Sequence, residues 1–228
     1  MRDEEKSADK EMDQSALQKL IAAMPGIKKD ARAIINGFFG DRLETSDSSS
    51  AIQMSMRLSS HDSALDLSKI SSQLSNAKQN ICILVHGVMA NETVWRFSEE
   101  KNQDYGSNIV ENYPDTTVVY LRYNSGLHIS TNGQKLAAMI KDLIDAWPVK
   151  VNSISFIGHS MGGLVTRSAC YYGAKLGDTW VPKTKRIFLL GSPSRGAPLE
   201  QIANITSFTL KKIFNPWTKL IAKIIESR

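Results

Sequence analysis

Residues 156–163 read FIGHSMGG, in which a single serine, Ser160, lies between Gly158 and Gly162. The apolar run SISFI precedes this motif and an apolar helical pattern follows it, so the serine falls at a strand–turn–helix junction. Such a tight turn strains the serine backbone and requires positions two before and two after it to be nearly free of side chain. The stretch therefore predicts a nucleophile elbow with Ser160 as the nucleophile.

Two other interpretations of this motif stay open. A glycine-rich turn of a Rossmann-like sheet would also place glycines between a strand and a helix, with an incidental serine. A phosphate-binding loop is the weaker alternative, because GHSMGG has neither the lysine of a P-loop nor the GxGxxG order. The flanking strand and helix favour the elbow, since the start of the helix would point N–H groups at an oxygen that becomes anionic during acyl transfer.

The surroundings of the motif predict an α/β fold. From residue 81 onward, apolar runs of about five residues alternate with helical segments, which is typical of βαβ units and a mostly parallel sheet flanked by helices. The run AIQMSMRL at 51–58 alternates and is predicted to be an edge strand. The other predicted strands are 81–85, 116–123, 153–158 and 186–191, and the predicted helices are 93–113, 130–147 and 162–176.

Composition divides the chain into two parts. Residues 1–50 form a charged tail and a helical arm, and we expect a single α/β domain over residues 51–228. The start of the chain is densely charged and no run of about 18 apolar residues occurs, so we expect a cytoplasmic protein. The net charge of +5 is too diffuse to indicate a nucleic-acid partner.

The two cysteines, Cys82 and Cys170, lie in apolar surroundings and read as buried thiols. The sequence offers no closely spaced third and fourth ligand beside them, so neither a metal site nor a cofactor is predicted.

A second motif, ICILVHGVMAN, is an apolar strand that ends in His86 and Gly87. An oxyanion hole takes one N–H from the residue after the nucleophile and another from the loop after a neighbouring strand. This assigns the backbone N–H groups of Met161 and Val88 as the donors. We expect Gly87 to allow a close approach and His86 to anchor the loop by hydrogen bonds; a buried strand followed by an ordinary turn remains the alternative.

The segments LVHGVMAN, YLRYNSGLHISTNG, FIGHSMGGLVTRSACYYGA and LLGSPSRGAPLEQ together resemble the α/β-hydrolase lipases and esterases, and most closely the bacterial proteins similar to GPI inositol deacylases. The resemblance implies an ester hydrolase acting on small-molecule or lipid esters, with Ser160 as nucleophile and YNSGLHIS, including His128, at the rim of the site. Where such hydrolases often read GTPH, this chain reads GSPSRG, which puts the shape of one pocket wall in doubt.

The resemblance also implies a catalytic acid and a histidine after the serine, but no histidine follows Ser160. We therefore expect the triad acid and base to be missing from this chain. Either the hydrolase domain is partial and stops before its last strands, or the protein is a non-catalytic binding relative. His128 remains open as an unorthodox base; His61, His86 and His159 have weaker claims.

Residues 207–228 alternate apolar side chains with lysines. This pattern fits lid or cap helices over the site, and equally a peripheral element on a membrane surface. The oligomeric state is left open by the sequence.

Overall fold

The computed structural model describes residues 33, 36–37, 52–59, 63–98 and 103–194. The predicted tail and arm at 1–50 therefore lie outside the described residues except for Ala33, Asn36 and Gly37, which are helical. The predicted lid or membrane segment at 207–228 and His61 also lie outside them.

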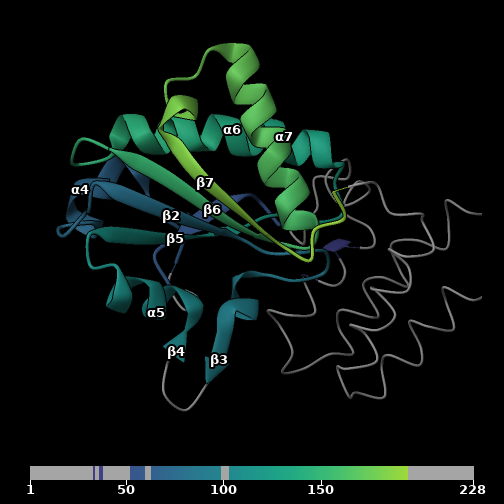
Figure 1. Cartoon of the computed structure of the whole chain (residues 1–228), viewed down its shortest axis with the longest axis horizontal. Helices are drawn as coiled ribbons and strands as arrows, with labels where there is room; N and C mark the ends of the chain where they lie inside the picture. Colours follow the sequence, from purple (N-terminus) through teal and green to yellow (C-terminus); the bar gives the residue numbers. More distant parts are fainter. Residues whose placement is uncertain (1–32, 34–35, 38–51, 60–62, 99–102, 195–228) are drawn as a thin grey trace, which may run out of the picture.

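A five-stranded sheet forms the centre of the described structure, with the strand order β1-β5-β2-β6-β7 (Figure 1). The four strands from β5 to β7 run parallel, whereas β1 pairs antiparallel with β5 at one edge. This confirms the predicted mostly parallel sheet and the predicted edge strand. The strands are β1 (Ser55–Arg57), β2 (Asn80–Val85), β5 (Thr116–Arg122), β6 (Ser153–His159) and β7 (Thr184–Leu190).

Helices cover both faces of this sheet, as Figure 1 shows. The long helices α6 (Ile129–Ala146) and α7 (Met161–Leu176) pack on one face, and α5 (Tyr105–Asn112) lies on the other. Right-handed crossovers explain the division, because the chain moves one way along the sheet from β5 to β6 to β7 and the opposite way from β2 to β5. The described residues also include short helical turns: η1 (Leu67–Lys69), α4 (Ile70–Gln73) and η3 (Val181–Lys183).

Strand β2 shows why the centre of the sheet is buried on both sides. Ile81, Ile83 and Val85 belong to the large core that includes residues of α6 and α7, and the alternating Cys82 and Leu84 belong to a smaller core on the other face. A parallel strand covered on both faces reads as a continuous apolar run, which is how ICILV reads.

Both cysteines are free thiols; Cys82 is buried, as predicted, whereas Cys170 is only partly buried. Burial raises the pKa of Cys82 to about 12 and that of Cys170 to about 11, so both thiols stay protonated near neutral pH.

The predicted helix at 93–113 is wrong in its first half. The side chain of Asp104 accepts a hydrogen bond from the Ser107 N–H (2.8 Å), and the Asp104 N–H donates to Ser107 Oγ (3.0 Å). This capping box starts a new helix at Tyr105 and ends any helix that precedes it. The described residues before it form η2 (Glu92–Trp95) and two short strands, β3 (Arg96–Ser98) and β4 (Gln103–Asp104), which pair antiparallel.

Candidate active site

Ser160 lies between the end of β6 and the start of α7, so the predicted strand–turn–helix context is confirmed. Its backbone has φ 51° and ψ −122°, in a region that residues other than glycine seldom adopt. The turn is held from the next strand, since the Ser160 N–H donates to the carbonyl oxygen of Leu190 (2.8 Å). A strained serine fixed at the carboxyl end of a buried strand is a preorganised arrangement.

The two glycines that flank the serine leave no room for a side chain. A Cβ on Gly158 would lie 2.5 Å from the Gly163 Cα, and one on Gly162 would lie 2.2 Å from the carbonyl oxygen of Val85. These neighbours are backbone atoms, which cannot rotate away as a flexible side chain can. The steric reason given for the GxSxG spacing is therefore present in the structure.

The loop after β2, residues 86–92, lies directly against the serine turn. A Cβ on Gly87 would lie 3.1 Å from the Ser160 Cβ, so this glycine allows the close approach that the sequence predicted. The N–H of Met161 is the first of α7 and has no carbonyl partner within its own helix. Val88, the other predicted donor, follows Gly87 in the same loop. Both backbone segments assigned to the oxyanion hole thus adjoin Ser160, while their role as donors stays a prediction.

His86 is fully buried at the end of β2. Its Nδ1 contacts the carbonyl oxygen of Gly87 at 2.8 Å, its ring stacks on Tyr123 with centroids 4.3 Å apart, and the Tyr123 hydroxyl donates to the His86 carbonyl oxygen (2.8 Å). Because a carbonyl oxygen only accepts, Nδ1 carries the proton and Nε2 is unprotonated. Burial lowers the pKa of His86 to about 4, which keeps the ring neutral at physiological pH. These contacts are those of a residue that anchors the loop.

The remaining described histidines, His128 and His159, are exposed. His128 precedes α6, in the loop after β5, and β2 separates β5 from the β6 strand that leads to Ser160. His159 ends β6, and desolvation lowers its pKa below the usual value. Within the described part of the chain, Ser160 Oγ makes no hydrogen bond to a histidine or to any other residue.

The described acidic residue that follows the serine, Asp178, is engaged elsewhere. Its carboxylate accepts a hydrogen bond from Trp180 Nε1 (3.2 Å) beyond the C-terminal end of α7, which is the end of that helix farthest from Ser160. Ser194, in the GSPSRG turn, is described and exposed, whereas Arg195 is not described.

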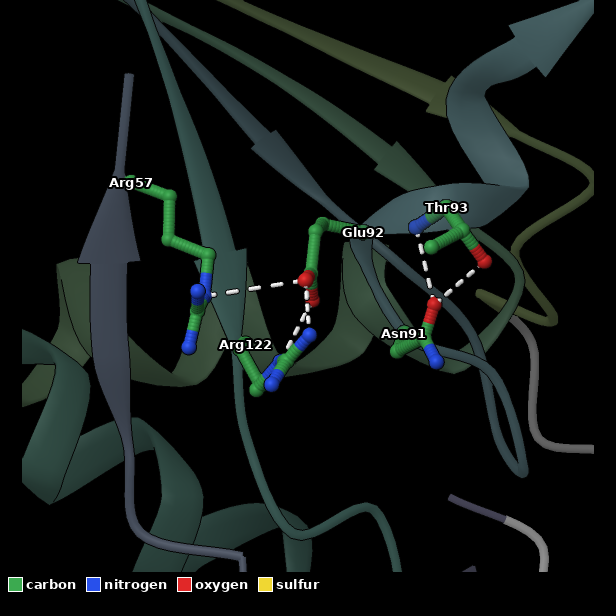
Figure 2. A network of polar contacts seen from close by, with 5 residues as sticks. All are labelled: Arg57, Asn91, Glu92, Thr93 and Arg122. Carbon is green, nitrogen blue, oxygen red and sulfur yellow. Dashed lines mark hydrogen bonds and ion pairs between the residues drawn. The ribbon is translucent and has the colours of Figure 1, made fainter. Parts of the chain in front are cut away.

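A buried ion-pair network that the sequence analysis did not find lies at the far end of the 86–92 loop (Figure 2). Arg122 binds both carboxylate oxygens of Glu92: its Nε donates to Oε2 (2.7 Å) and its Nη2 donates to Oε1. The Nε of Arg57 lies 3.6 Å from the same Oε1. Burial acts to raise the pKa of Glu92, but the hydrogen bonds and charge of Arg122, together with Arg57, outweigh it and hold this pKa below its usual value. The available signal was an arginine at the end of an otherwise apolar strand, in LRY.

The described residues contain no group of three or more His, Cys, Asp or Glu side chains that could hold a metal ion. Among the helices of the same residues, none has the length and apolar character needed to cross a membrane.

Among solved structures, similar chains include two of Bacillus licheniformis lipase BlEst2. The mature form has a TM-score of 0.43 and is 17% identical, and the match covers 67% of this chain and 51% of the lipase chain. The propeptide form has a TM-score of 0.45 and is 16% identical, and the match covers 76% of this chain and 31% of the lipase chain. Lactobacillus rhamnosis esterase B, in a structure with a C4-C4 SN3 tributyrin phosphonate inhibitor, has a TM-score of 0.38 and is 17% identical. That match covers 64% of this chain and 49% of the esterase chain. This chain thus spans about half or less of the length of these structures.

No curated protein matches the sequence. A family model described as "Putative serine esterase (DUF676)" matches residues 75–189, half of the 228-residue chain, and the match includes both the HG loop and the serine turn. The chain therefore belongs to this serine esterase family.

Proposed function

We propose that the protein is a serine ester hydrolase in which Ser160 Oγ attacks the ester carbonyl. The observation that carries the proposal is the backbone of Ser160, held at φ 51° at the start of α7. The carbonyl oxygen would become an oxyanion bound by the N–H groups of Val88 and Met161. Its collapse would expel the alcohol and leave an acyl-serine, which water then hydrolyses to a carboxylic acid.

The substrate class follows from the resemblance to lipases and GPI inositol deacylases carried by LVHGVMAN and GHSMGG. We propose small-molecule or lipid-like esters, processed without a cofactor.

One observation favours a second candidate function, a binding protein that keeps the pocket without the chemistry. Acylation requires a base to accept the Oγ proton, and within the described residues no histidine is hydrogen-bonded to Ser160 Oγ. His128 and His159 are the described histidines with exposed rings near the carboxyl edge of the sheet.

Covalent labelling by a fluorophosphonate separates the two functions, because the probe reacts with an activated serine. Because the described residues place no base at Ser160, we expect slow labelling that still reaches one probe per chain, that peptide mapping places on Ser160 and that Ser160→Ala abolishes. The matched control is Ser192→Ala, since Ser192 is a nearby serine whose Oγ lies 3.5 Å from the Gly158 carbonyl oxygen. Labelling should persist in that variant. A folded parent protein that stays unlabelled would reject the hydrolase and favour the binding protein.

Turnover of p-nitrophenyl esters is expected to be weak, because the described structure shows no base at Ser160. Oxyanion stabilisation and binding alone can leave roughly a 10³ to 10⁴ acceleration over water when triad members are absent. The test compares hydrolysis rates of the parent, Ser160→Ala and His128→Ala proteins. Fast turnover that depends on Ser160 and disappears in His128→Ala would show that His128 is the base after all.

A further inference from the structure

The loop that carries Val88 is fixed to the sheet at three points. At its start, the Tyr123 hydroxyl donates to the His86 carbonyl oxygen (2.8 Å); in its middle, the Met89 N–H donates to Ser125 Oγ (2.9 Å). At its end, Arg122 binds both carboxylate oxygens of Glu92. All three anchors come from residues 122–125, at the end of β5. The position of the Val88 N–H is thus set from one neighbouring strand.

The third anchor is the unusual one, because it consists of buried charges. The Glu92 side chain is 1% exposed and that of Arg122 is 21% exposed, with Arg57 beside them at 13%. Taking an ion pair out of water costs free energy that apolar side chains of similar size avoid, so stability alone is a weak reason for such a pair. A guanidinium that binds both carboxylate oxygens fixes direction as well as distance. Geometry is the better explanation for the pair.

We propose that Glu92, held by Arg122, is a positioning residue that sets the orientation of the 86–92 loop and therefore of the Val88 N–H toward the oxyanion. The inference rests on the proposed hydrolase function of Ser160. The two arginines that bind Glu92 come from paired strands of the sheet (Figure 2). Arg122 is the last residue of β5, and Arg57 is the last residue of β1. Asn91 orders the adjacent turn, because its Oδ1 accepts a hydrogen bond from the Thr93 N–H (2.8 Å).

Two variants of the whole chain test the pair. Glu92→Gln removes the charge while keeping the size, and Arg122→Lys keeps the charge while losing the bidentate geometry. The matched control is Asp145→Asn, which removes an exposed ion pair to Lys141 (2.7 Å) on α6. The rate of Ser160 labelling is measured against fluorophosphonate concentration, which separates probe binding from the bond-forming step. Hydrogen–deuterium exchange of residues 86–92 and of α6 and α7 is measured in parallel.

Glu92→Gln is expected to slow the bond-forming step about tenfold to a hundredfold, because a displacement of about 1 Å can cost that much. Probe affinity should change less than about twofold, and exchange should quicken in 86–92 but not in α6 or α7. Arg122→Lys should lie between this variant and the parent, and Asp145→Asn should match the parent. Bond formation at the parental rate in either folded pair variant would overturn the proposal, as would exchange that quickens equally throughout the protein.

The outcomes also separate this inference from the function on which it rests. If the parent is labelled at Ser160 and Glu92→Gln is labelled as fast, positioning fails and the hydrolase stands. If the parent is not labelled, the hydrolase fails, and exchange confined to 86–92 then decides whether Glu92 orders the loop. If Glu92→Gln does not fold, Arg122→Lys decides, because it retains the opposite charge.

Discussion

Gly162→Val is expected to lower the free energy of unfolding by about 4 kcal/mol or more, the range of severe backbone and packing defects. A Cβ at this position would lie 2.2 Å from the Val85 carbonyl oxygen and 2.4 Å from that of His86. Val85 is the last residue of β2, in the middle of the sheet, and His86 is the first residue of the loop that follows, so either this backbone or the start of α7 must move. Chemical denaturation of the two purified proteins measures the difference.

The matched control is Gly177→Ala, at the C-terminal end of α7. Gly177 has φ 73° with nothing within 4 Å of an added Cβ, so only the left-handed backbone is strained, at a cost of about 1 kcal/mol. Ser160→Ala should leave stability near that of the parent, because alanine also has a Cβ and adds no atoms to the turn. A Gly162→Val protein as stable as the parent would contradict the steric account of the elbow.

Acidification from pH 7 to pH 4 is expected to remove about 3 kcal/mol of stability through His86 alone. Burial lowers the pKa of His86 in the folded protein to about 4, below the usual value of about 6.5. The unfolded chain therefore binds a proton first as the pH falls. The contribution is fully present above about pH 6.5 and is lost as the pH approaches 4. Urea unfolding at a series of pH values measures the slope.

His86→Gln should flatten that slope, even if it lowers stability at every pH. A His86→Gln protein with the parental pH dependence would show that another group is responsible. Below the usual pKa of a glutamate the loss should continue, because the lowered pKa of Glu92 acts in the same direction.

The parallel part of the sheet could be predicted from the sequence because strands such as β2 and β5 are apolar on both faces and stand out from the helices between them. The serine turn could be predicted because its steric demands act on residues two positions away, at Gly158 and Gly162. The pairing of β3 with β4 could not, since the start of the helix after β4 depends on a capping box at Asp104 that competes with an otherwise helical pattern.

The Glu92 network was missed for a different reason. Glu92 and Arg122 are 30 residues apart and Arg57 is farther still, so nothing in local spacing brings them together. Only the strand order, with β5 between β1 and β2, places the two arginines beside the loop that follows β2. Sequence patterns report which faces are apolar, and they do not report which charges meet at the end of a sheet.

The close contact between the 86–92 loop and the serine turn has a consequence for how this protein can change over evolution or by design. Gly87 lies against Ser160, and Gly162 lies against the end of β2, so each segment occupies space that the other would need. A substitution that enlarges one segment requires a compensating change in the other. The HG and GHSMG segments must therefore be exchanged together when sites are transplanted between scaffolds.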